Sequence, residues 1–92
     1  MLNFEWDKAK ANSNISKHNI TFEEASTVFN DILSTTFPDP HHSLNENRYI
    51  ILGITILSKL LVISHTYRDG NVRIISARSA TKKEKKFYEN SK

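Results

Sequence analysis

The residues best suited to chemistry in this sequence are a histidine and three arginines on two predicted strands of its second half. His65 and Arg68 stand near the end of one β-prone run, and Arg73 and Arg78 near the start and end of the next. The intervening Asp69-Gly70 pair predicts a tight hairpin turn, because glycine supplies the positive φ angle that such turns demand. Three of the four residues therefore flank one turn. The position of Arg78 depends on the strand register, which the sequence does not fix.

Imidazole and guanidinium groups are the parts needed to cleave RNA without a metal ion. The 2′-hydroxyl of the substrate is the nucleophile, so the protein supplies a base for it, cations for the phosphate and an acid for the leaving 5′-oxygen. Histidine suits proton transfer at neutral pH, since its unperturbed pKa is about 6.5, and arginine binds phosphate through two parallel hydrogen bonds. We predict His65 as base or acid, with Arg68 and Arg78 on the phosphate. The alternative is that they are surface residues and ion-pair partners, as in many proteins.

Metal and cofactor chemistry find little support in the sequence. It has no cysteine, which excludes disulfides, thiolate zinc sites and cysteine nucleophiles. His41 and His42 follow Asp39, but adjacent histidines in a loop point apart, and two imidazoles do not complete a site. There is no glycine-rich phosphate loop and no nucleophile elbow. We therefore expect neither a metal nor a cofactor.

The charge is divided unevenly between the two halves of the chain. Residues 1–46 carry three basic and seven acidic residues, a net charge of −4, whereas residues 47–92 carry ten basic and three acidic residues, a net charge of +7. This asymmetry indicates a surface that meets a polyanion such as nucleic acid. The alternative is that the lysines of residues 82–86 form a solvated helix face. No stretch is typical of a signal peptide or a membrane span, so we expect a cytoplasmic protein.

Two helices are predicted in the first half, after a short strand or anchoring segment with alternating Phe4 and Trp6. Asp7 is a suitable N-cap for a helix to about His18, and Asn19 can adopt the left-handed conformation that ends it. Ala11 and Ile15, four positions apart, would stack on its apolar face. The capping box at residues 21–24 opens a second helix, and the two should pack as a hairpin. The apolar face of the second helix would carry Phe22, Ala25, Val28, Phe29 and Ile32.

The second half is predicted to be mainly β-sheet. A short β-prone run at residues 35–37 is followed by longer ones at 48–56, 60–67 and 72–79. A capping box at residues 81–84 then opens a C-terminal helix to about Glu89. We predict one α+β domain over residues 1–92: a helical hairpin, a mainly antiparallel sheet and a C-terminal helix.

Alternation along the strands predicts which side chains share a face of this sheet. It places His65 with Ile63 on one side of the run at residues 60–67. In the run at residues 72–79 it places Arg73 with Ala77, and Arg78 on the other side.

The sequence resembles the BrnT family of bacterial toxins along nearly its whole length. The Trp-Asp opening and the Arg-Ile-Ile-Ser-Ala-Arg segment are the most specific parts. Asn19 stands where the family usually has glycine, and asparagine tolerates the same backbone conformation. The residues that carry the resemblance are Phe4-Glu5-Trp6-Asp7, Lys10, Asn14, Lys17, His18, Phe22-Glu23-Glu24-Ala25, Phe37-Pro38-Asp39, Arg48, Gly53, His65-Thr66-Tyr67-Arg68, Arg73-Ile74-Ile75-Ser76-Ala77-Arg78, Ala80-Thr81, Glu84 and Tyr88.

The resemblance implies a RelE-like fold and the function of a type II toxin–antitoxin ribonuclease. Such a toxin is a metal-independent endoribonuclease of the bacterial cytoplasm that inhibits translation by degrading RNA. The resemblance also implies a BrnA-type antitoxin that dimerises, binds operator DNA and carries two toxins, as a 2:2 heterotetramer. This chain would then touch RNA directly and operator DNA only through the antitoxin, without a membrane partner.

For the site, the resemblance ranks His65 and Arg68 highest for activity. Arg78 follows as a further catalytic residue, and the expected RNA contacts are Lys17, Arg73 and Tyr88. Two other function classes stay open. One is a non-catalytic nucleic-acid-binding or regulatory module, in which the basic residues 47–92 bind phosphate without cleaving the nucleic acid. The other is a structural protein whose sheet or helix completes a partner.

Overall fold

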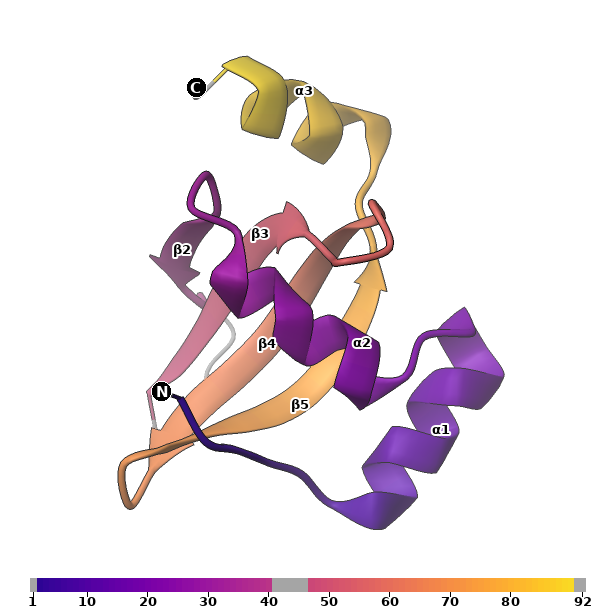
Figure 1. The fold of residues 1–92 in the computed structure, drawn as a ribbon, viewed down its shortest axis with the longest axis vertical. Coiled ribbons are helices and arrows are strands. Elements are labelled where there is room, and N and C mark those ends of the chain that lie inside the picture. Colours follow the sequence, from indigo (N-terminus) through magenta and orange to yellow (C-terminus); the bar gives the residue numbers. More distant parts are fainter. Residues whose placement is uncertain (1, 41–46, 91–92) are drawn as a thin grey trace.

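The computed structural model describes residues 2–40 and 47–90, and its centre is a five-stranded sheet flanked by helices (Figure 1). The strands lie in the order β1-β5-β4-β3-β2; β1 runs parallel to β5, and each other neighbouring pair is antiparallel. The predicted α+β class is confirmed. No helix in the described part of the chain has the length and apolar character to cross a membrane. In chain order the elements are β1 (Phe4–Glu5), α1 (Lys8–His18), α2 (Phe22–Ser26), the 3-10 helix η1 (Thr27–Asn30), β2 (Thr35–Pro38), β3 (Arg48–Ile54), β4 (Leu60–Arg68), β5 (Asn71–Ser79) and α3 (Lys82–Asn90).

The first two helices begin and end where short polar side chains can satisfy their terminal backbone groups. A carboxylate oxygen of Asp7 accepts a hydrogen bond from the backbone N–H of Lys10 at 2.9 Å. The hydroxyl of Thr21 accepts one from the N–H of Glu24 at 3.0 Å. Asn19 ends α1 with a φ of 56°. These predicted caps are confirmed, since the groups involved would otherwise lack partners.

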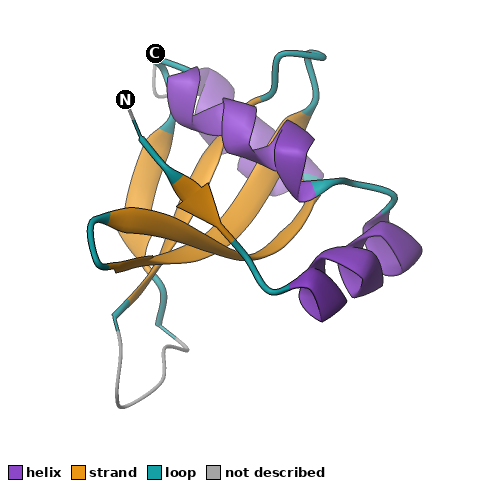
Figure 2. Cartoon of the chain, turned by 60° about the horizontal axis from the view of Figure 1, so that its bottom comes forward, coloured by secondary structure: helices purple, strands orange, loops and turns teal. Residues whose placement is uncertain are grey.

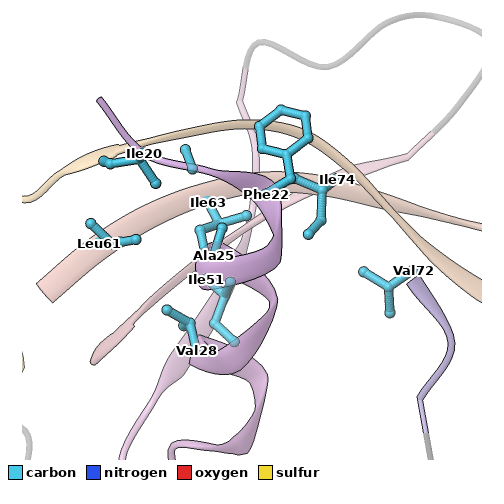
Figure 3. Packing of buried hydrophobic residues seen from close by; sticks show 10 residues of the cluster. Ile20, Phe22, Ala25, Val28, Ile51, Leu61, Ile63, Val72 and Ile74 are labelled. Carbon is cyan, nitrogen blue, oxygen red and sulfur yellow. The ribbon is translucent and has the colours of Figure 1, made fainter. Parts of the chain in front are cut away.

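Helices α2 and η1 cover one face of the sheet, which we call the first face; the opposite side is the second face. The main core lies between the first face and these helices (Figures 1 and 3). Ile32 was predicted to join this core, but it is 95% exposed. The prediction was wrong because α2 ends at Ser26 and η1 at Asn30, so the chain has left the helix before Ile32. The buried residues of this cluster are Ile20, Phe22, Ala25, Val28, Ile51, Leu61, Ile63, Val72, Ile74 and Ala77.

Helix α1 is attached to β5 by a buried polar side chain. The Oδ1 atom of Asn14 accepts a hydrogen bond from the backbone N–H of Ala77, and its Nδ2 donates one to the carbonyl of Ile20, both at 3.0 Å. Ile15, expected on an apolar face, is 42% exposed. α1 makes more contact with β5 than with α2. The two helices therefore cover the sheet separately and do not pack as a hairpin; Figure 2 shows α1 beside the sheet.

Helix α3 packs over one end of the second face of the sheet. Tyr88 is buried there with Leu52 and Val62. The predicted capping box is confirmed, because the Glu84 N–H donates to the Thr81 hydroxyl at 3.2 Å and a Glu84 carboxylate oxygen accepts from the Thr81 N–H at 2.8 Å. α3 thus begins at a fixed point after β5.

The β4–β5 hairpin closes through Asp69 and Gly70, with φ angles of 53° and 80°. Both residues adopt the positive φ that a primed turn requires, as predicted. Beyond the turn the two strands contain an irregularity: the register shifts between Ser64 and His65. Ile75 is an additional residue of β5 at this point, which makes a β-bulge.

The bulge decides which residues of β5 share a face. His65 pairs with Ile74 and Ile63 pairs with Ala77, and all four lie on the first face. The expectation that Arg73 shares a side with Ala77 was therefore wrong, because it assumed strict alternation through position 75.

Candidate nucleic-acid interface

All four arginines of the chain project from the second face of the sheet. Thr66, which follows the first-face residue His65, pairs with Arg48 of β3 and with Arg73 of β5. Arg68 is two positions beyond Thr66 and lies on the same face. We call this surface the arginine face; its residues are Arg48, Arg68, Arg73 and Arg78. A row of guanidinium groups of this kind matches the repeating charge of a phosphodiester backbone.

At the hairpin end of the arginine face, β1 contributes a carboxylate. The Nη1 atom of Arg73 donates to Glu5 Oε2 at 2.8 Å, and Asn71 Nδ2 donates to Glu5 Oε1 at 3.2 Å. The hydrogen bond from Arg73 holds the pKa of Glu5 below its ordinary value, and the charge of Arg68 acts in the same direction. Glu5 therefore stays ionised and orients Arg73 on the face.

At the other end of the face, Arg78 is bound to helix α3. Its Nη1 and Nη2 atoms donate to the two carboxylate oxygens of Glu84, each at 2.8 Å. This bidentate pair lowers the pKa of Glu84 to about 2 and raises that of Arg78. Arginine has five N–H groups, so donors of Arg78 remain for a phosphate beside the carboxylate.

His65 lies on the first face of the sheet, opposite the arginines, and is fully buried. Its ring centroid is 4.9 Å from that of Phe29, 5.6 Å from that of Tyr67 and 6.0 Å from that of Tyr49. The Nδ1 atom lies 3.3 Å from the carbonyl oxygen of Ile63, which favours the proton on Nδ1. Its Nε2 has no hydrogen-bond partner among the described residues. Burial lowers the pKa of His65, so the ring is neutral at pH 7.

The two remaining predicted contacts lie on helices. Lys17 is exposed in the last turn of α1. Tyr88 is 3% exposed, and its hydroxyl donates to Asp31 Oδ2 at 2.6 Å. Burial and this carboxylate raise the pKa of Tyr88 to about 12. Tyr88 is thus buried together with Leu52 and Val62, and the little of it that is exposed lines a concave surface with Asp31 and Ile54.

The structure therefore brings together some of the predicted site residues. Arg68, Arg73 and Arg78 share one face, while His65 lies behind the sheet. Arg48 and Glu5 join these residues, although neither was predicted from the sequence as a site residue. Both depend on strand pairing, Arg48 through β3 with β4 and Glu5 through the parallel β1–β5 pair, and no local pattern reveals such pairing.

The described residues offer no cluster of side chains suited to a metal ion. Within residues 2–40 and 47–90, no three histidine, aspartate or glutamate side chains gather in a way that could hold a metal ion. His42 and His41, the histidines considered from the sequence, lie outside the described residues.

Comparisons with known proteins agree with the resemblance seen in the sequence. The family model described as the ribonuclease toxin BrnT of type II toxin–antitoxin systems matches residues 6–84. The crystal structure of the Brucella abortus ribonuclease toxin BrnT shares the fold with a TM-score of 0.69 at 20% sequence identity, covering 89% of this chain and 100% of that chain. The comparison with curated proteins gives no significant match. Since the family match spans most of its length, the chain belongs to the BrnT family of ribonuclease toxins of type II toxin–antitoxin systems.

Proposed function

We propose that this chain is a metal-independent endoribonuclease that inhibits translation by cleaving RNA on the arginine face. The observation that carries the proposal is the gathering of all four arginines on one sheet face in a chain of a ribonuclease toxin family. Arginine keeps its charge at any physiological pH and donates paired hydrogen bonds to phosphate oxygens. Successive phosphates of an RNA strand bound there would meet arginines from β3, β4 and β5.

The proposed step is attack of the substrate 2′-hydroxyl on the adjacent phosphorus. The 2′-oxygen forms a bond to phosphorus, the bond to the 5′-oxygen breaks, and the hydroxyl proton leaves while the leaving oxygen gains one. Negative charge accumulates on the non-bridging oxygens during this step. Arg68 and Arg73, at the hairpin end, would stabilise that charge, and such electrostatic stabilisation is often the largest catalytic contribution. Arg78, at the other end of the face, would hold an adjacent phosphate in place.

The arginine face offers fewer candidate acids and bases for proton transfer than cations for binding phosphate. His65, predicted from the sequence as acid or base, is buried on the opposite face, so this role requires a conformation in which the ring reaches the substrate. Glu84, with a pKa of about 2, is a weak base at neutral pH. The geometry therefore supports phosphate stabilisation by arginine as the main catalytic contribution.

A cognate antitoxin follows from the type II toxin–antitoxin family. We infer that it is of the BrnA type, that it forms a 2:2 heterotetramer with the toxin, and that operator DNA is contacted only through it. The mixed α+β architecture is compatible with a RelE-like fold. A cytoplasmic location fits both RNA cleavage and neutralisation by such a partner.

The test combines growth with purified components. Expression of the chain without its antitoxin should arrest growth, and co-expression of the antitoxin should restore it. The purified protein should cleave a single-stranded RNA in buffer that contains EDTA. Normal growth at confirmed expression, together with intact RNA, would refute the proposed activity. Cleavage that disappears on addition of EDTA and returns with a divalent cation would refute metal independence alone.

Two observations favour the alternative of a module that binds nucleic acid without cleaving it. His65 is buried on the opposite face of the sheet. The carboxylates on the arginine face, Glu5 and Glu84, have lowered pKa values and are therefore weak bases for the 2′-hydroxyl. This alternative predicts salt-sensitive RNA binding with no cleavage products. The cleavage assay above separates the two functions directly.

A further inference from the structure

A concave surface lies beside the arginine face, between helix α1 and the exposed edge of β5. It has a volume of about 270 Å³. Lys10, Ser13 and Lys17 line it from α1, and Ile75 and Ser76 line it from β5. We call it the α1 groove. The spacing of three and four positions along α1 places these helix residues on one side of the helix.

The groove is basic and carries no acidic lining residue. Lys10 and Lys17 are both exposed, and the structure shows no ion pair for either of them within its described residues. The arginine face differs, because Arg73 and Arg78 are each paired with a carboxylate. Lysines that lack an anionic partner leave a positive potential open to a ligand.

The groove and the arginine face meet at the β-bulge. Ser76 pairs with Ser64 on the second face and also lines the groove. Arg78 lies two positions further along the same face of β5. The additional residue Ile75 also lines the groove, so the bulge lies where the two surfaces meet. A strand of nucleic acid bound on the arginine face can therefore continue into the groove at Ser76.

We propose that the α1 groove is a second phosphate-binding site that holds RNA adjacent to the segment bound on the arginine face. This inference rests on the proposed function, and it specifies where the bound RNA extends beyond the arginine face. The lysines would contact backbone phosphates, and the Ser13 and Ser76 hydroxyls would donate to phosphate oxygens. Backbone contacts of this kind position a nucleic acid without reading its sequence, so the groove contributes affinity and placement.

The test uses a labelled 2′-O-methyl oligonucleotide of about 12 nucleotides, which lacks the attacking hydroxyl and cannot be cleaved. Its affinity is measured by fluorescence anisotropy over a range of salt concentrations. The double variant Lys10→Gln, Lys17→Gln should bind about 10-fold more weakly at low salt. Its slope of log affinity against log salt should be shallower by about 1.4, because single strands contribute about 0.7 for each phosphate contact.

The matched control removes the same charge elsewhere. Lys8→Gln, Lys83→Gln alters one exposed lysine of α1 and one of α3; neither lines the groove, and neither has an ion pair within the described residues. It should change affinity by about 2-fold or less, since only screened, long-range charge is lost. Equal affinity and slope for the groove variant and the wild type would overturn the proposal. Unchanged RNA affinity with weakened antitoxin binding would also overturn it and would assign the groove to protein contacts.

Failure of this inference is distinguishable from failure of the proposed function. If wild-type protein cleaves RNA but the groove variant binds the oligonucleotide normally, the groove proposal falls and the activity stands. If wild-type protein cleaves nothing but binding depends on Lys10 and Lys17, the activity falls and the phosphate site stands.

Discussion

Arg73 and Arg78 lie five positions apart in one strand yet project from the same face of the sheet. An odd separation in a regular strand places two side chains on opposite faces. The bulge at Ile75 adds one residue and restores the shared face. Each arginine is then held by a carboxylate from another element, Arg73 by Glu5 of β1 and Arg78 by Glu84 of α3. The two ends of the arginine face are thus fixed by tertiary contacts.

The first prediction concerns the arginines of this face. Arg73→Ala and Arg78→Ala should each lower the rate of RNA cleavage by about 100-fold. The first removes charge stabilisation of the transition state, and the second removes a contact that positions the adjacent phosphate. Lysine at either position should recover part of the loss, since it keeps the charge but not the planar fork. Initial cleavage rates of a short RNA provide the measurement. Lys85→Ala on the exposed side of α3 is the control, and a loss as large there would contradict the assignment.

The second prediction separates a catalytic role of His65 from a structural one. His65→Phe keeps an aromatic ring beside Phe29 and Tyr67, so it should fold and retain cleavage within about 3-fold of wild type. His65→Ala should lower the free energy of unfolding by about 2–4 kcal/mol, because it leaves a cavity in the core. Cleavage rates and denaturant unfolding curves provide both readouts. A folded His65→Phe variant that cleaves no RNA would establish the catalytic role predicted from the sequence.

The third prediction concerns the pH dependence of stability. The pKa of Glu84 falls from 4.5 to about 2 in the folded protein. Its pair with Arg78 therefore stabilises the fold above about pH 4.5, and this contribution is lost as the pH falls toward about 2. Because the pair is partly exposed, a contribution of about 1–2 kcal/mol is expected. Melting temperatures of wild type and Glu84→Gln should differ at pH 7 and converge near pH 2. A difference that persists at the lower pH would exclude this ion pair as the cause.

The fourth prediction concerns the contact between η1 and β3. A Cβ atom at Gly53 would lie 2.9 Å from Val28 Cγ1 and 3.0 Å from Ser34 Cβ. Gly53→Ala should therefore lower the free energy of unfolding by about 1–3 kcal/mol through overpacking. Gly70→Asn is the matched control, because that site is open and asparagine tolerates its positive φ. Chemical denaturation measures both variants. Equal stability of Gly53→Ala and wild type would show that η1 can move away from the strand.

Several features were determined by the sequence itself because they depend on residues close together in the chain. Asp7, Thr21 and Thr81 begin helices through hydrogen bonds that span three positions. Asp69 and Gly70 close a hairpin because their backbones accept a positive φ. The strand positions followed from runs of β-branched residues, and family membership followed from motifs distributed along the whole chain.

The tertiary structure alone decided which of the predicted site residues meet. The bulge at Ile75, the parallel pairing of Glu5 beside Arg73 and the burial of His65 all result from packing between segments that are distant in sequence. Strand register is set by which side chains fill the core beneath α2, and a shift of one residue exchanges the two faces of the strand. The local conformational preferences of the residues do not determine the strand register. The sequence therefore predicted Arg68, Arg73 and Arg78 as site residues, and the packing of the sheet placed them on one surface with Arg48.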